Sequence, residues 1–234
     1  MQNFSECPNC KAKNPYYQLV CSNCKAYIRE KVFNIDFWNT FWHMFDSPIK
    51  QLQNIIFSDH KNFLAFTLFL VSFKFTVNSF LLTNFFNPNL NLTSDVIFNM
   101  MLLIITFAIV FIIYAFLLKY IYLSLKVKTR FKDNLAVLVF SQSAILFSLF
   151  FVFPVQLGVF GVHWFVFNPS PILIKPSIAY ALISLDAILL IWGLFQIILA
   201  HYIQTKSVII SIFLGLILYL FINILFLFFP FSVS

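Results

Sequence analysis

The sequence predicts an all-α polytopic membrane protein with five transmembrane helices, preceded by a small cysteine-rich head and interfacial amphipathic helices. Hydrophobic residues make up 61% of the chain and charged residues 10%, whereas about a quarter of the residues of a soluble domain are charged. All four cysteines lie near the N-terminus, between positions 7 and 24. The composition therefore excludes an ordinary water-soluble protein of this size.

Five stretches of the chain meet the length requirement for a membrane-spanning helix. A bilayer core of about 30 Å needs about 20 mostly apolar residues in a helix. The stretches run over about 63–82, 97–123, 135–153, 178–200 and 208–229. Pro154 is expected to end the third, since proline interrupts a helix. The chain is thus divided into a head (1–30), a juxtamembrane segment (31–61) and a membrane domain (62–234).

The four cysteines occur in two copies of one short motif. The copies are Cys7-Pro8-Asn9-Cys10-Lys11-Ala12 and Cys21-Ser22-Asn23-Cys24-Lys25-Ala26. A Cys-x-x-Cys turn directs two thiolates at one metal, and Zn²⁺ prefers four such ligands in a tetrahedron. The motif predicts structural Zn²⁺ held by Cys7, Cys10, Cys21 and Cys24 in a zinc ribbon. A pair of redox motifs is the alternative, but a thioredoxin-like site needs a β-α-β domain that 30 residues are too few to form.

The basic residues predict which side of the membrane each loop occupies. Seven Lys and Arg residues precede the first span, and none lies in the loop 83–96. The loop between the second and third spans carries Lys126, Lys128, Arg130 and Lys132. Because positively charged loops stay in the cytoplasm, we expect a protein integral to the cytoplasmic membrane, with a cytoplasmic N-terminus and an external C-terminus. Metal-bound thiolates on the reducing side of the membrane agree with this orientation.

The juxtamembrane segment is too polar to cross a bilayer but has two amphipathic patterns. Aromatic residues recur at helical spacing at Phe37, Trp38, Phe41, Trp42 and Phe45. Ser47 and Pro48 then favour the start of a second helix, with an apolar stripe of Ile49, Leu52, Ile55 and Ile56. The stripes fit two alternatives equally well: contact with the cytoplasmic face of the bilayer, or packing on the ends of the spans.

Two charged residues fall inside predicted spans, Lys74 in the first and Asp186 in the fourth. A charged group is costly there unless it is paired. At a rise of about 1.5 Å per residue both lie roughly 18 Å from the cytoplasmic side. The equal depths predict an ion pair between the two spans. A structural pair that fixes helix neighbours is favoured over a proton or ion relay, because a transport path usually contains more intramembrane polar groups.

The rest of the sequence lacks the motifs of several function classes. No phosphate-binding glycine loop, Gly-x-Ser-x-Gly elbow or His-Glu-x-x-His motif is present. The sequence therefore indicates a non-enzymatic protein with no catalytic residues. Acidic residues among the cytoplasmic lysines dilute any basic patch, so nucleic acid is not an expected partner. The expected partners are the lipid bilayer and a cytosolic protein whose identity the sequence does not give, and the oligomeric state is equally open.

Two short segments resemble those of the Yip-domain family of five-span membrane proteins, whose members interact with Rab/Ypt GTPases. They are Met44-Phe45-Asp46-Ser47-Pro48 before the first span, and Ile191-Trp192-Gly193-Leu194 followed by His201-Tyr202-Ile203-Gln204-Thr205-Lys206-Ser207. The likeness covers roughly residues 40–229, and a fused N-terminal zinc ribbon is similar to that of many prokaryotic members. It implies a non-enzymatic membrane protein. The acidic, Gly-Pro-containing cytoplasmic stretch of eukaryotic members is missing, and a second zinc-ribbon membrane family has a similar aromatic and basic run before its first span.

Two functions follow from these observations. The first is a membrane scaffold or adaptor that presents the cytoplasmic ribbon to a partner. The second is a small transporter or channel that uses Lys74 and Asp186. Loss of the ribbon should abolish the first function, whereas loss of the ion pair should abolish the second.

Overall fold

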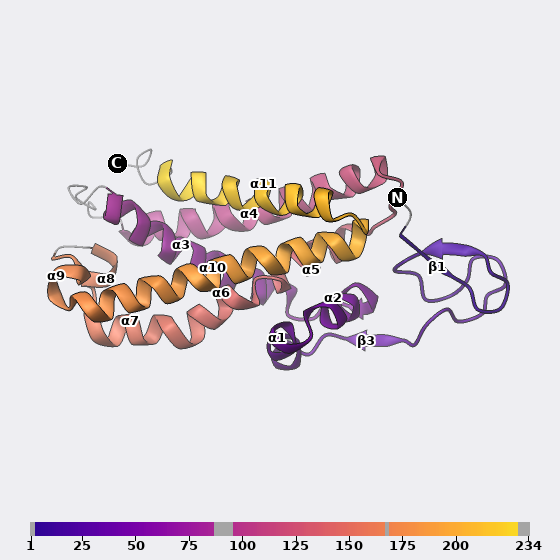
Figure 1. Ribbon diagram of the computed structural model, residues 1–234, viewed down its shortest axis with the longest axis horizontal. Coiled ribbons are helices and arrows are strands. Elements are labelled where there is room, and N and C mark those ends of the chain that lie inside the picture. The colour runs from indigo at the N-terminus through magenta and orange to yellow at the C-terminus, as the bar shows by residue number, and fades with distance from the viewer. Residues whose placement is uncertain (1–2, 87–95, 167–168, 229–234) are drawn as a thin grey trace. The chain divides into compact units, whose positions relative to one another are not determined.

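The computed structural model describes residues 3–86, 96–166 and 169–228. The described chain is mostly helical, with short strands near the N-terminus (Figure 1). This confirms the predicted helical membrane-type architecture in outline. It also places the cysteines in a non-helical segment of their own.

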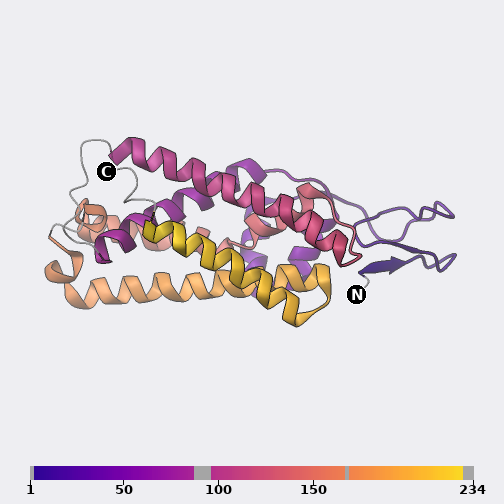
Figure 2. The ribbon, with the colours of Figure 1, turned by 90° about the horizontal axis from the view of Figure 1, so that it is seen from above.

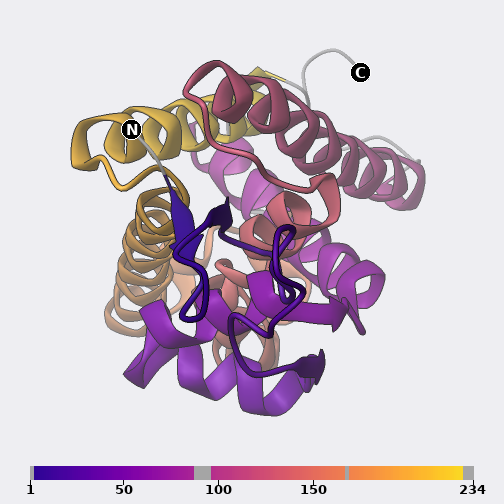
Figure 3. The same ribbon diagram turned by 90° about the vertical axis from the view of Figure 1, so that its right-hand side faces the viewer.

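The N-terminal segment forms two short hairpins, one around each Cys-x-x-Cys motif (Figure 3). Strand β1 (Phe4–Glu6) pairs antiparallel with β2 (Lys13–Pro15), and the first motif lies in the loop between them. An antiparallel bridge between Val20 and Tyr27 closes the second hairpin around the second motif. The sequence repeat is therefore also a structural repeat.

The juxtamembrane segment contains the two expected helices, α1 (Phe37–Asp46) and α2 (Pro48–Phe57). Asp36 caps α1 by accepting a hydrogen bond of 2.7 Å from the backbone N–H of Asn39. Pro48 at the first turn of α2 confirms the predicted boundary, because proline needs no donor there. Strands β3 (Val32–Asn34) and β4 (Ser58–His60) pair in parallel on either side of these helices in the sequence.

Among the described residues, four helical stretches are long and apolar enough to cross a membrane. They are Leu64–Leu82, Ile97–Ser124, Ser143–Phe160 and Pro176–Thr205. The first, second and fourth belong to α3 (Leu64–Phe86), α4 (Val96–Ser124) and α10 (Pro176–Thr205). The third is a run of three shorter helical pieces, described below. The helix for the fifth predicted span, α11 (Val208–Phe228), is strongly apolar, but the part of it whose side chains are described, Val208–Ile224, is shorter than the other four. Figure 2 shows the tight reversal between α10 and α11.

The third span differs from its predicted limits of 135–153. Helix α5 (Phe131–Phe140) ends before Ser141, and a new helical run begins at Ser143 with α6 (Ser143–Phe147). A π-helical turn, η1 (Ser148–Val152), follows and leads into α7 (Phe153–Phe160). The prediction that Pro154 ends the helix is wrong. Pro154 lies in the first turn of α7, where the wider π-turn before it accommodates a residue that lacks an N–H donor.

The connector after α7 contains only short helices among its described residues. Gly161, with a φ of 56°, ends α7 in a left-handed conformation that suits glycine. Helices α8 (His163–Val166) and α9 (Pro171–Ile174) follow. As the prolines and glycines of this region predict, none of these pieces is long enough to be a further span.

The chain divides into two compact units that are each built from three segments. The first contains Met1–Thr67, Phe111–Ser143 and Phe195–Gly215. The second contains Leu68–Val110, Ala144–Leu194 and Leu216–Ser234. Helices α3, α4, α10 and α11 therefore each contribute residues to both units. The predicted boundaries at residues 30 and 61 divide the chain along the sequence. The two units instead group segments that contact one another in space.

Gly215 allows α11 to approach α10 closely in the first unit. A Cβ atom at Gly215 would lie 2.7 Å from Cγ1 of Ile198, whereas one at Gly158 would have no neighbour within 4 Å. Small residues permit such close helix contacts in membranes. We expect Gly215→Ala to be less stable than the matched helical control Gly158→Ala by about 1–3 kcal/mol, the usual cost of overpacking. Thermal unfolding in detergent would measure this difference, and equal melting temperatures would contradict it.

Candidate metal centre and intramembrane polar cluster

The four cysteine thiols meet at one place, as the sequence predicts. Their sulfur atoms all lie within 4.8 Å of one another. Cys7 Sγ is 3.5 Å from Cys24 Sγ, and Cys10 Sγ is 3.5 Å from Cys21 Sγ, so the close contacts join the two motifs. Four sulfurs around one Zn²⁺ at about 2.3 Å would be about 3.8 Å apart in a tetrahedron. The spacing therefore fits one metal ion with four thiolate ligands.

The backbone of each motif holds its cysteines in the same way. The N–H of Lys11 donates to the carbonyl of Cys7 and that of Lys25 to the carbonyl of Cys21, at 2.9 and 3.1 Å. Lys11 and Lys25 both adopt left-handed conformations, with φ of 58° and 61°. These turns direct backbone N–H groups toward the sulfur atoms. The N–H of Cys24 is the largest factor that lowers the pKa of Cys21 to about 6, and the N–H of Cys10 lowers that of Cys7 in the same way.

Asn14 supports the cluster from the adjacent strand β2. Its Nδ2 donates to Cys21 Sγ at 3.5 Å and to the carbonyl of Ala12 at 2.9 Å. Its Oδ1 accepts from the backbone N–H of Ser22 at 2.9 Å. Asn14 is buried and links one hairpin to the other. Such outer-shell hydrogen bonds orient metal ligands, and the sequence pattern alone offers no reason to select this residue.

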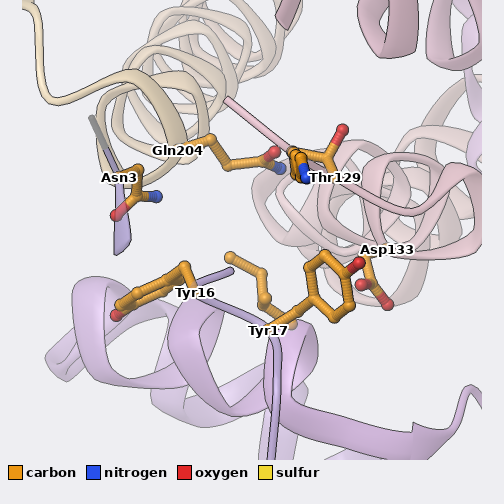
Figure 4. Close-up of a pocket in the computed structure, with 8 residues that line it drawn as sticks. Asn3, Tyr16, Tyr17, Thr129, Asp133 and Gln204 are labelled. Atoms are coloured by element: carbon orange, nitrogen blue, oxygen red, sulfur yellow. The ribbon is translucent and has the colours of Figure 1, made fainter. Parts of the chain in front are cut away.

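The hairpins are fixed to the helices of the first unit by polar contacts. Arg29 donates through Nη2 to the carbonyls of Tyr17 and Phe57, at 2.8 and 3.2 Å. Asn3 Nδ2 donates to the carbonyl of Ile203 in α10 at 3.0 Å. Figure 4 shows Asn3, Tyr16 and Tyr17 facing Thr129, Asp133 and Gln204 across a small cavity of about 10 Å³. Within this unit, these contacts hold the N-terminal head against α2 and α10.

Asp133 lies at the centre of a second set of contacts in the same unit. It accepts from Arg130 Nε at 2.6 Å and lies 3.0 Å from Lys61 Nζ. Lys61 also donates to carbonyls of Ile55 and Ser58 at the end of α2, where a positive charge is favoured by the helix dipole. Burial lowers the pKa of Lys61, while Asp133 opposes that change. These contacts join α2 to α5.

The two intramembrane charges are paired within the second unit. Lys74 Nζ lies 3.2 Å from Asp186 Oδ2. Lys74 is fully buried and Asp186 is 8% exposed. Asp186 also accepts hydrogen bonds from Gln156 Nε2, at 2.7 Å, and from Ser148 Oγ. The carboxylate thus has three donors, which compensates for its removal from water.

The two additional donors come from the helical run that differs from the prediction. Ser148 begins the π-helical turn η1, and Gln156 lies in α7, beyond the predicted end of the span. The backbone N–H of Phe153 donates to the carbonyl of Ser148, the spacing of a π-turn. The Phe153 ring itself lies 5.6 Å from Lys74 Nζ. The π-turn therefore supplies the Ser148 hydroxyl to the ion pair, and the first residue of α7, Phe153, supplies an aromatic face.

Two further buried polar side chains form contacts between helices. In the first unit Gln196 accepts from Ser143 Oγ at 2.8 Å and donates to the carbonyl of Met44 at 2.7 Å. His201 is buried, and its Nδ1 lies 2.6 Å from the Tyr122 hydroxyl. Both are interhelical contacts, which polar side chains commonly make in membranes.

The juxtamembrane aromatic residues are divided between two environments. Phe37 and Phe41 are buried, and the Phe37 ring contacts those of Phe63 and Phe66 near the start of α3. Trp38 and Trp42 are 54% and 49% exposed, and Phe45 is half-buried. On α2, Leu52, Ile55 and Ile56 are buried whereas Ile49 is exposed. One edge of each helix packs on the protein, and the two tryptophans face outward.

Comparisons of the chain with protein-family models, with curated proteins and with solved structures found no match. Its functional assignment therefore depends on the two sites described above.

Proposed function

We propose that the chain is a non-enzymatic membrane scaffold or adaptor whose N-terminal zinc ribbon presents a surface to a cytosolic protein. The convergence of four thiols at zinc-compatible spacing carries this proposal. Cys7, Cys10, Cys21 and Cys24 would hold the ion, which would supply folding energy to a head with little core of its own. Four thiolates complete the coordination shell, so the ion would have no open position for catalysis.

The attachment of the head favours a structural platform over a freely tethered domain. Arg29 and Asn3 bind backbone carbonyls of α2 and α10, and the Arg130 guanidinium lies 4.8 Å from the Tyr17 ring. A head held by such contacts would present its exposed residues in a fixed orientation. Preorganisation of this kind lowers the entropic cost of binding a partner.

The proposed topology has five spans, with α11 as the fifth. The apolar composition of α11 and its length of 21 helical residues support this assignment. The basic residues before α3 and between α4 and α5 favour a cytoplasmic N-terminus. Five spans then leave the C-terminus outside. The exposed Trp38 and Trp42 would lie at the cytoplasmic interface, a position that suits indole rings. The Yip-domain resemblance is part of the same proposal.

The second candidate function is a proton or ion relay through Lys74 and Asp186. The addition of Ser148 and Gln156 to the pair, next to a π-turn, favours it, since π-turns are frequent at functional sites and intramembrane ionisable groups often mark transport paths. Complete burial of Lys74 and the full set of donors to Asp186 favour a structural role. The structural role remains our preference.

One experiment separates the two functions. Tagged wild-type chain, Cys7→Ser/Cys24→Ser and Asp186→Asn would be purified from membranes, and the same proteins reconstituted for proton flux with an enclosed pH-sensitive dye. A scaffold should lose its co-purifying protein in the cysteine variant, retain it in Asp186→Asn and show no flux. Flux that the wild type supports and Asp186→Asn abolishes would reject the scaffold, as would a partner that the cysteine variant retains.

A further inference from the structure

Three lysines from two distant parts of the sequence line one groove in the first unit. Lys13 comes from β2, and Lys126 and Lys128 follow α4. The groove has a volume of about 260 Å³, and its other lining residues are Asn3, Phe4, Asn14 and Pro15. No carboxylate is among them. Three positive charges around one hollow, without an acidic residue, favour an anionic ligand.

The side-chain amides of the groove bind the protein itself, so the lysine ammonium groups are the donors left to a ligand. One of them, Lys13 Nζ, also lies 4.5 Å from the centroid of the Phe4 ring. Asn14 and Asn3 donate through their side-chain amides to the protein itself. By contrast, no ion pair involves Lys13, Lys126 or Lys128 within the described part of the chain, where the ion pairs are those of Lys31, Lys61, Lys74 and Arg130. All three lysines are exposed. Ammonium groups act as point-charge donors to phosphate oxygens.

Lys126 occupies a backbone position that favours glycine. It lies just beyond the C-terminus of α4 with a φ of 61°. Its N–H donates to the carbonyl of Leu123 at 2.9 Å, and that of Val127 donates to the carbonyl of Tyr122 at 2.8 Å. This is the Schellman pattern, in which glycine is preferred because a side chain is strained in the left-handed region. A lysine here places an ammonium at the groove at some cost to the helix end.

The position of the groove indicates the source of the anion. Lys126 lies two residues after Ser124, the last residue of a helix that is long and apolar enough to cross a membrane. Helix α4 has 29 residues, more than the roughly 20 that a hydrocarbon core of about 30 Å requires. Its last turns, and the groove beside them, would therefore reach the lipid headgroups. Phe4 and Pro15 add an apolar side to the groove. A free soluble anion would need no such placement.

We propose that this groove binds the phosphate of an anionic phospholipid headgroup, with Lys13, Lys126 and Lys128 as its donors. The bound lipid would connect the cysteine-bearing head to the membrane at the end of α4. The site adjoins the cysteine cluster, because Asn14 lines the groove and also donates to Cys21 Sγ, but it is distinct from the partner-binding role proposed above.

The structure offers a matched pair of variants to test the site. Lys126→Gly removes one groove ammonium and relieves the left-handed strain, so a loss of binding cannot be assigned to misfolding. Lys206→Gly makes the same change in charge at another left-handed helix end, with φ of 55°. Lys206 does not line the groove, and its ammonium lies over the rings of Tyr16 and Tyr202.

The zinc-loaded full chain in detergent would be titrated with short-chain phosphatidylglycerol or phosphatidylcholine, and bound lipid counted by native mass spectrometry. We expect saturable binding of phosphatidylglycerol only, about fivefold weaker in Lys126→Gly and unchanged in Lys206→Gly. The double variant Lys13→Ala/Lys128→Ala should abolish the preference. Equal binding of phosphatidylcholine, or an equal loss in Lys206→Gly, would overturn the proposal. Displacement of the lipid by equimolar inorganic phosphate would also overturn it, because the ligand would then be a soluble phosphate.

Discussion

Removal of one cysteine thiol is expected to unfold the N-terminal hairpins while the helices remain folded. Cys21→Ser removes a fully buried thiol from hairpins whose paired strands are only three residues long and whose second turn is closed by one isolated bridge. Structural zinc contributes about 10–16 kcal/mol of apparent binding energy in zinc-finger peptides, far more than so small a core supplies. Elemental mass spectrometry would measure the zinc content of the hairpins, which should be lost. Circular dichroism would measure the helicity, which should be kept.

A graded pair of asparagine variants makes this result specific. Asn14→Ala removes the donor to Cys21 Sγ and is expected to weaken zinc binding by about 10- to 100-fold, as for other outer-shell partners. Asn23→Ala changes an exposed side chain in the same motif and should leave the affinity unchanged. Competition with a chromophoric chelator would measure both. A wild-type chain that is purified under reducing conditions without one equivalent of zinc would contradict the metal assignment.

Loss of the Asp186 carboxylate is expected to have the second large effect. Asp186→Ala would leave the ammonium of Lys74 fully buried without its anion, and breaking a buried pair from one side costs about 3–5 kcal/mol. The double variant Lys74→Met/Asp186→Leu should be much less damaging, because apolar residues of similar volume often replace a buried pair at little cost. Thermal unfolding in detergent and the amount of protein in the membrane would report both. Equal damage from the single and double variants would show that the pair is not the relevant contact.

Two buried serines supply the matched control for this network. Ser148→Ala removes a donor to the Asp186 carboxylate and should cost about 1.5–3 kcal/mol, the range for a hydrogen bond to a charged group. Ser72 is equally buried, but its hydroxyl has no hydrogen-bond partner among the described residues. Ser72→Ala should therefore be neutral or slightly stabilising. Equal effects at the two positions would show that Ser148 contributes only through packing.

Much of the architecture could be predicted because it depends on local patterns. The apolar stretches specify helices through length and composition, and Ser47 and Pro48 mark the boundary between α1 and α2. Two Cys-x-x-Cys motifs predict a common centre, because four thiolates can bind one metal ion, and the four thiols do meet at one place. Lys74 and Asp186 could be matched because each charge needs a partner in hydrocarbon and their depths agreed.

The details that could not be predicted depend on contacts between residues far apart in the sequence. The apolar run 135–153 predicts one continuous helix, but α5 ends at Phe140 and the next helix begins at Ser143. Ser143 there donates to Gln196, 53 positions away. Likewise, the apolar pattern does not reveal that Ser148 and Gln156 bind Asp186, because their pairing requires the π-turn and the continuation of the helix through Pro154.

The sequence by itself determined the helical membrane-type architecture, the four-thiol cluster and the partners of the intramembrane charges. The architecture and the ion pair follow from free-energy costs that any fold must meet, because apolar surface must leave water and a buried charge must be paired. The thiol cluster follows from two motifs whose spacing suits one metal ion. Only the tertiary structure decided which neutral polar groups complete each site. Asn14 at the sulfurs, Ser148 and Gln156 at Asp186, and Lys13 beside Lys126 and Lys128 are such choices. Polar residues at several positions in the sequence could complete each of these sites. Which of them does so depends on how segments that are distant in the sequence pack together.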